Sequence, residues 1–292
     1  MRVLYDYHLH LWPHESTETP LEIGQLAAYC EQAAAAGVTE IALTEHLFRF
    51  RQAMEVIGPF WEAVDDEPSM RSSMAGYVAH HATADLDAYV ELGLEAKRLG
   101  LPVKIGLEVD YYRGQMGDVA DLLAAYPFDV LLGSVHWVGA WRFDHLEDGL
   151  QLARWDSRDV EACWDAYTEA IEELAATRAI DVLAHPDLIK VAGRIPSNPV
   201  EWWDRIAEAS KDAGVATELS SAGWRKPVGE QYPAIPLLDR LLAAEVPMTT
   251  ASDAHHQATV GDGIGDLVAL ATIAGLRSIA RFDARVRSEV LL

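Results

Sequence analysis

The sequence predicts an α/β protein folded as a closed barrel of about seven strands, and three observations support this. Short runs rich in β-branched and aromatic residues alternate with helical patterns along the chain, which is typical of right-handed crossovers and a parallel sheet. Seven such runs are present. The first strand-to-helix turn lacks the glycine fingerprint of a dinucleotide-binding sheet. We therefore favour a closed barrel over an open doubly wound sheet.

The elements follow from local pattern. The expected strands are residues 3–10, 40–46, 102–111, 128–137, 180–186, 215–221 and 247–255. The first helix is expected to start after Thr19, with Pro20 at its first position and Glu22 three residues after the cap, and to stop at Gly37. Later helices are expected at 86–99, 158–176, 200–213 and 235–244, with Gly100 and Gly214 closing the first and third of these.

Composition limits the possible functions. The chain has 292 residues, half of them apolar, and no linker or repeat, so we expect a single domain over residues 1–292. Its formal charge of −23 argues against nucleic acid or an anionic membrane as the main partner. A small phosphorylated substrate remains compatible, because bound divalent ions reverse the local charge. Cys30 and Cys163 are expected to be buried free thiols.

Cellular location is inferred from what the pattern lacks. No stretch reaches the roughly 18 to 20 uninterrupted apolar residues that a membrane-spanning helix needs. The chain also does not start with basic residues followed by an apolar run. We therefore expect a cytoplasmic protein.

The segment DYHLHLWPH, residues 6–14, is the first candidate for a functional site. In a strand, Asp6, His8 and His10 lie on one face, and the residues between them lie on the apolar face. Partnerless buried ionisable groups are costly, whereas two histidines at i and i+2 are well placed to hold one metal ion. Taken alone, the segment is compatible with metal ligands or with a hydrogen-bonded surface pair.

Six of the seven expected strands end on histidine, glutamate or aspartate. These residues are His8 and His10, Glu45 and His46, Glu108, His136, His185 and Asp187, and Asp253 and His255, with His14 just beyond the first strand. Active sites of α/β barrels form at this face, so the pattern predicts a multinuclear metal site. Nitrogen and oxygen ligands without thiolate favour Zn, Mn or Fe over Mg or Ca.

Other histidines are given ordinary roles. Asp253 and His255 share a strand face, so His255 is the expected ligand and His256 is expected near the ligands or at the surface. His80, His81 and His145 lie outside strand ends and are expected to be surface or loop residues.

The ordered motifs resemble those of the polymerase-and-histidinol-phosphatase (PHP) superfamily. They are His8-x-His10, Thr44-Glu45-His46, Gly106-Leu107-Glu108, Gly133-Ser134-Val135-His136, Ala184-His185 and Ser252-Asp253-Ala254-His255. Residues 126–141 (YPFDVLLGSVHWVGAW) and 220–238 (SSAGWRKPVGEQYPAIPLL) resemble its histidinol-phosphate phosphatase branch. The resemblance covers nearly the whole chain except residues 47–85.

This resemblance implies a distorted TIM-like barrel of seven (β/α) units, the PHP fold, with two or three divalent metal ions. It assigns His8, His10, Glu108 and Asp253 to one metal, Glu108, His136 and His185 to a second, and His14, His46 and His255 to a third. It places Arg225 and Lys190 at the phosphate, and it gives Glu108 and Asp253 the catalytic positions. Asp187 is interpreted as an acid for the leaving group, as a partner of a ligand histidine, or as a loop cap.

The implied activity is metal-dependent hydrolysis of a phosphomonoester, with L-histidinol phosphate of histidine biosynthesis as the substrate. Another small phosphate ester or a nucleotide is the alternative. An amidohydrolase is disfavoured, because the two cations would then lack an anion. The chain departs from the branch at Leu47-Phe48, where relatives commonly have Ser-Pro, and at Val191, where a second basic residue is usual.

Residues 47–85 are expected to cover the site as a lid. The candidate specificity residues in it are Arg49, Arg51, Trp61, Arg71 and Tyr77.

Overall fold

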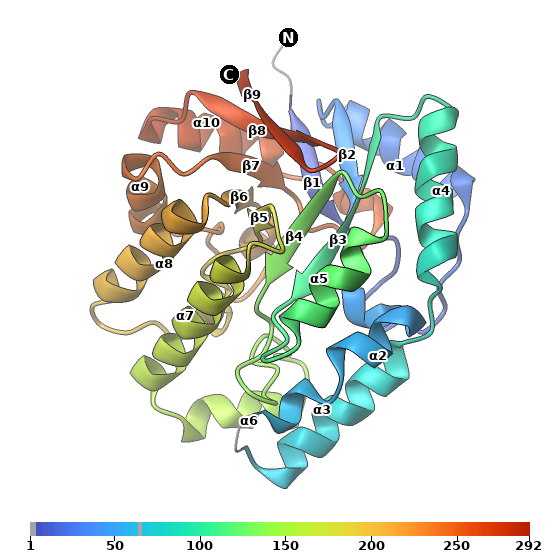
Figure 1. Cartoon of the computed structure of the whole chain (residues 1–292). Coiled ribbons are helices and arrows are strands. Elements are labelled where there is room, and N and C mark those ends of the chain that lie inside the picture. The colour runs from blue at the N-terminus through green and yellow to red at the C-terminus, as the bar shows by residue number, and fades with distance from the viewer. Residues whose placement is uncertain (1–3, 64–65) are drawn as a thin grey trace.

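The computed structural model describes residues 4–63 and 66–292 and contains a seven-stranded parallel sheet (Figure 1). Its strands are β1 (Tyr5–Leu9), β2 (Glu40–Leu43), β3 (Val103–Asp110), β4 (Val130–Ser134), β5 (Val182–Leu183), β6 (Ala216–Ser220) and β7 (Met248–Ala251). They lie side by side in sequence order, and each neighbouring pair is parallel. All seven expected strands are therefore confirmed, with narrower bounds.

The sheet closes on itself where β1 meets β7. Beyond the regular strands, the His10 amide donates to the Ala254 carbonyl at 2.7 Å, and the Asp253 amide donates to the His8 carbonyl at 2.8 Å. These bonds lie at the carboxyl ends of the two strands. The first and last strands thereby bring their expected ligand residues together.

Helices alternate with the strands and surround the barrel in Figure 1. They are α1 (Ile23–Ala35), α4 (Leu86–Arg98), α5 (Met116–Ala124), α6 (Gly149–Ser157), α7 (Val160–Thr177), α8 (Val200–Ala213), α9 (Ile235–Ala243) and α10 (Ile264–Ala274). The expected start of the first helix is wrong, because α1 begins at Ile23 after an extended Glu22. The Trp12 indole donates to the Pro20 carbonyl at 2.8 Å, which holds the preceding backbone against the loop after β1.

One contiguous core fills the barrel and the space under its helices. Small residues are required where strands approach closely, because a Cβ at Gly106 would lie 2.4 Å from the Val130 carbonyl oxygen. Cys30 and Cys163 are buried and free, as expected. The expectation of one domain over residues 1–292 stays a prediction.

A C-terminal hairpin, β8 (Ser278–Asp283) and β9 (Val286–Leu291), lies at the end of the barrel where the strands begin (Figure 1). Arg281 contacts both oxygens of Glu40 at 3.0 and 2.7 Å, and Lys104 Nζ lies 2.5 Å from Asp283 Oδ1. This hairpin was not expected from the sequence pattern. It leaves the opposite end of the barrel as the place for a site.

The described residues of the segment 47–85 lie at that opposite end. They contain 3₁₀ turns at Leu47–Arg49, Arg51–Ala53 and Phe60–Glu62, and the helices α2 (Met54–Ile57) and α3 (Pro68–His81). Phe48 is buried between the rings of Tyr77 and Trp137, with centroids 5.4 and 6.1 Å away. Across the described ranges 4–63 and 66–292, no helix is long and apolar enough to cross a membrane.

Candidate metal centre

Glu108, near the end of β3, is the central carboxylate of the site. Its Oε2 lies 3.2 Å from His8 Nε2 and 2.9 Å from His46 Nδ1. Its Oε1 lies 3.0 Å from His185 Nε2 and 3.5 Å from His136 Nε2. His10 Nε2 also lies 3.6 Å from Oε2, so each oxygen faces its own set of histidines, which is the arrangement that a carboxylate bridging two ions needs.

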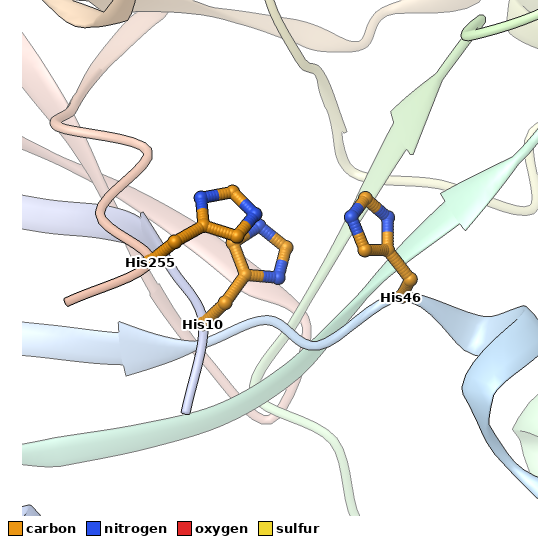
Figure 2. Close-up of side chains that lie close together, drawn as sticks. All are labelled: His10, His46 and His255. Carbon is orange, nitrogen blue, oxygen red and sulfur yellow. The ribbon is translucent and has the colours of Figure 1, made fainter. Parts of the chain in front are cut away.

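A second group of the expected ligands surrounds Asp253, just after β7. Its Oδ1 lies 3.5 Å from His10 Nε2 and 3.6 Å from His255 Nδ1. The His14 ring stacks on the His255 ring, with centroids 3.8 Å apart. Figure 2 shows His10 and His255 close together, with His46 facing them from the segment after β2. The structure thus brings all nine expected ligands to one place.

The donor set fits divalent metal ions. Buried atoms without hydrogen-bond partners converge here, among them Nε2 of His8, His10 and His255, both ring nitrogens of His46, and Glu108 Oε2. Four groups have ligand atoms within 4.8 Å of one another: His10, His46 and His255; His8, His10 and Glu108; His46, Glu108 and His136; and His8, His185 and Glu218. Mixed imidazole and carboxylate ligands suit Zn, Mn or Fe.

Two of these ligands hold an unusual backbone conformation. His185 and Asp253 have φ angles of +26° and +52°, in the left-handed region that residues other than glycine adopt at a cost. The Asp253 segment is supported by Asp6, whose carboxylate accepts bonds from the amides of Ser252 and Gly261, both at 2.8 Å. Burial raises the pKa of Asp6 to about 6, although Ser252 lowers it.

Two carboxylates that were not expected from the sequence contact histidines of the expected ligand set. Glu218 Oε2, inside β6, lies 2.9 Å from His8 Nδ1, and Asp110 Oδ1, at the end of β3, lies 2.6 Å from His136 Nδ1. Carboxylates on the far nitrogen of metal-binding histidines fix the ring and raise its basicity. Asp110 could have been found, because it shares the face of Glu108 two residues earlier.

Glu45 is a third carboxylate of this kind, although its neighbour His46 was the expected ligand. Its Oε2 lies 3.5 Å from His10 Nδ1, and its Oε1 accepts the amide of Trp12 at 2.9 Å. It therefore connects the loop after β1 to the end of β2.

The charges within the site favour ionised carboxylates and neutral outer histidines. Burial alone would raise the pKa of Glu108, but His8, His46 and His136 hold it well below its usual range. Burial and neighbouring histidines hold the pKa values of His14 and His255 well below theirs. Neutral imidazole and ionised carboxylate are the forms that bind metal.

The expected phosphate residues have different surroundings. Arg225 donates to the Ser252 carbonyl, and its Nη1 lies 2.9 Å from Asp262 Oδ2, so the guanidinium lies next to the segment that carries Asp253. Its side chain is 30% exposed, which leaves it accessible to a ligand.

Lys190 is buried instead. Its Nζ lies 2.7 Å from Glu230 Oε2, 2.8 Å from the Gln231 carbonyl and 3.0 Å from Asp187 Oδ2. Asp187 also accepts the Ala234 amide at 2.8 Å. These contacts match the loop-capping interpretation of Asp187, and its Oδ1 lacks a hydrogen-bond partner among the described residues.

The remaining histidines differ in placement. His80 and His256 are exposed, as expected. The expectation of a surface or loop position for His81 is wrong, because it is 5% exposed and its ring nitrogens face two carbonyl oxygens. His145, in a loop, contacts the Tyr77 ring at 5.0 Å between centroids.

A nearly closed seven-stranded (β/α) barrel with a histidine- and carboxylate-rich centre at the carboxyl ends of its strands defines the class of protein. The family described as "PHP domain" matches residues 7–222. The chain therefore belongs to the PHP family, as its motifs indicated.

A named relative and two solved structures are similar to the chain. A probable histidinol-phosphatase from Deinococcus radiodurans is 34% identical over 168 residues, which are 58% of this chain and 63% of the relative, so the match spans less than two thirds of that protein. A proposed histidinol phosphatase from Listeria monocytogenes superposes with a TM-score of 0.69 at 17% identity, covering 90% of this chain and 99% of that one.

The second solved structure is histidinol phosphate phosphatase from Lactococcus lactis subsp. lactis, in complex with zinc, L-histidinol and phosphate. It superposes with a TM-score of 0.65 at 20% identity, covering 98% of each chain. At these identities the two structures confirm the fold.

Proposed function

We propose that this protein is a metal-dependent phosphomonoesterase that hydrolyses L-histidinol phosphate to L-histidinol and phosphate. The observation that carries the proposal is the convergence of histidines on both oxygens of Glu108, next to an accessible Arg225. The names of the similar proteins support the choice of substrate.

The chain would hold two or three divalent ions. We assign His8, His10, Glu108 and Asp253 to one, Glu108, His136 and His185 to a second, and His14, His46 and His255 to a third. When bound, Zn, Mn or Fe would supply Lewis acidity to the phosphoryl oxygens and to the attacking water. Glu218, Asp110 and Glu45 would each fix the orientation of one ligand ring. The rings are those of His8, His136 and His10 respectively.

Arg225 is the proposed phosphate-binding residue. A guanidinium contacts phosphate through two parallel N–H bonds, which a lysine does not provide. Its present bonds to Asp262 and Ser252 fix the side chain beside Asp253. Lys190 can reach a phosphate only by releasing Glu230 or Gln231, so we assign it the smaller share of phosphate binding.

Asp187 is the proposed acid for the leaving alcohol. It follows His185 by two residues, and its Oδ1 has no hydrogen-bond partner within ranges 4–63 and 66–292. Its Oδ2 is fixed by Lys190 and by the Ala234 amide, so only Oδ1 could carry the proton. Asp187→Asn should slow the reaction more for alkyl esters than for aryl esters, whose leaving groups need no acid.

The test is release of inorganic phosphate from L-histidinol phosphate by metal-replete protein, beside a panel of other phosphomonoesters and nucleotides. Glu108→Gln should lower kcat/KM about a hundredfold or more, because it removes a charged group shared by five histidines. Glu172→Gln, a half-exposed carboxylate on α7, is the matched control. Preference for another ester would overturn the substrate, and failure to hydrolyse any ester would overturn the enzyme class.

A further inference from the structure

The loop that carries His14 has little structure of its own. Residues 13–17 form no helix or strand, and their internal backbone bond is Ser16 amide to Pro13 carbonyl at 3.0 Å. His14 nevertheless stacks closely on His255. Something outside the loop must therefore fix the position of His14.

Arg49 provides one such contact. Its Nη1 and Nη2 donate to the Pro13 carbonyl at 3.2 and 3.3 Å, and Nη2 also donates to the Ser16 carbonyl. The side chain is 1% exposed and lies over the Trp12 ring. A buried guanidinium is costly unless its donors are used, and here Nη1 and Nη2 are used on the two sides of His14.

His81 and Thr83 provide two more contacts. His81 Nε2 lies 3.1 Å from the carbonyl of His14 itself, while Nδ1 lies 3.0 Å from the Tyr77 carbonyl in the preceding turn of α3. Thr83 Oγ1 donates to the Thr17 carbonyl at 3.0 Å. Arg49, His81 and Thr83 therefore contact four backbone carbonyls of one loop. These belong to Pro13, His14, Ser16 and Thr17.

We propose that Arg49 and His81 are positioning residues that hold His14 against His255 for metal binding. The parts of the segment 47–85 around Arg49 and around His81 and Thr83 would then be a fixed support of the metal centre, in place of the movable lid expected from sequence. Arg49, expected to contact substrate, faces the loop backbone instead. The inference rests on the proposed function, because it assigns His14 a metal.

The experiment measures metal affinity and stoichiometry by chelator competition and mass spectrometry of bound Zn, for the full chain. His14→Ala defines the effect of losing the ligand. His81→Ala should weaken the same ion about tenfold, at the low end of the range for outer-shell partners, and leave the other ions in place. Thr83→Val, which removes a single hydroxyl, should shift the affinity less and in the same direction.

Two further variants separate positioning from general damage. His80 is the exposed neighbour of His81 on α3, so His80→Ala should keep the wild-type metal affinity. His81→Gln places an amide donor near the former Nε2 and should restore part of the loss. Melting curves confirm that each variant is folded.

The outcomes are distinct. If the wild-type protein binds no metal, the proposed function and this inference both fail. If it binds metal, and His81→Ala and Thr83→Val both keep wild-type affinity, the inference is wrong while the proposed function stands. If His81→Ala does not fold, the comparison of Thr83→Val with His80→Ala decides.

Discussion

Glu218→Gln is the perturbation that tests the site most sharply, because it changes charge without changing volume. Glu218 is fully buried in β6. Its Oε2 lies 2.9 Å from His8 Nδ1, and its Oε1 accepts the His185 amide at 2.8 Å. A glutamine has one acceptor oxygen, so its NH₂ group must face one of these two donors.

The expected loss follows from those two bonds. A hydrogen bond to a charged group contributes about 1.5 to 3 kcal/mol, which corresponds to roughly 10- to 100-fold in an equilibrium constant. If glutamine keeps the bond to the His185 amide, His8 loses the anion that fixes its ring and raises its basicity. We therefore expect metal affinity and kcat/KM to fall together by about that factor.

The assay is chelator competition for bound metal, with kcat/KM and the free energy of unfolding measured on the same preparations. Asp129→Asn is the matched control, because Asp129 is equally buried but accepts the Ile105 amide and pairs with Lys97 at the other end of the barrel. That variant should lose stability and keep metal affinity. Wild-type metal affinity in Glu218→Gln would refute the reasoning.

Three other outcomes are expected. Burial would lower the pKa of His136, but Glu108 and Asp110 raise it to about 10, so the metal-free protein holds a proton there at pH 7. Metal binding should release the His136 proton, so the apparent affinity for metal should rise with pH. Titration calorimetry in two buffers of different ionisation enthalpy measures this proton release, and equal binding enthalpies in both buffers would contradict the expectation. Gly106→Ala should lower the free energy of unfolding, measured by denaturant titration, by about 1 to 3 kcal/mol, because the added Cβ would clash with the Val130 carbonyl oxygen. Unchanged stability would show that β3 and β4 can move apart enough to accept the methyl group. Arg178→Gly should gain about 1 kcal/mol in the same titration, since Arg178 ends α7 with φ of +55°, and a loss would indicate an unseen role for the side chain.

Much of the site was accessible from sequence because barrel geometry is regular. Strands of period two have predictable faces, and the carboxyl ends of parallel strands meet at one end of the barrel. His8, His46, His136 and His185 could therefore be placed together without knowing any distance. The same argument separated His255 from His256.

The misses share one physical cause, which is dependence on long-range contacts. Glu218 lies inside a strand and acquires its role only when the closed barrel brings its side chain to His8, on a strand that is not a neighbour of β6. The start of α1 depends on the Trp12 indole, which overrides a good local cap at Thr19. The C-terminal hairpin is held by charges such as Glu40 that lie far away in sequence.

The seam between β1 and β7 also affects how the protein folds. Asp6 bonds to Ser252 across 246 positions of sequence, and the two sides of the seam supply His10 and Asp253 to the same site. Contacts of such high sequence separation are expected to form late in folding, because the entropy of closing a long loop is lost before the contacts contribute any stability. Binding of the ion assigned to His8, His10, Glu108 and Asp253 would therefore report on completed barrel closure, and that ion would stabilise only chains in which both ends have already been joined.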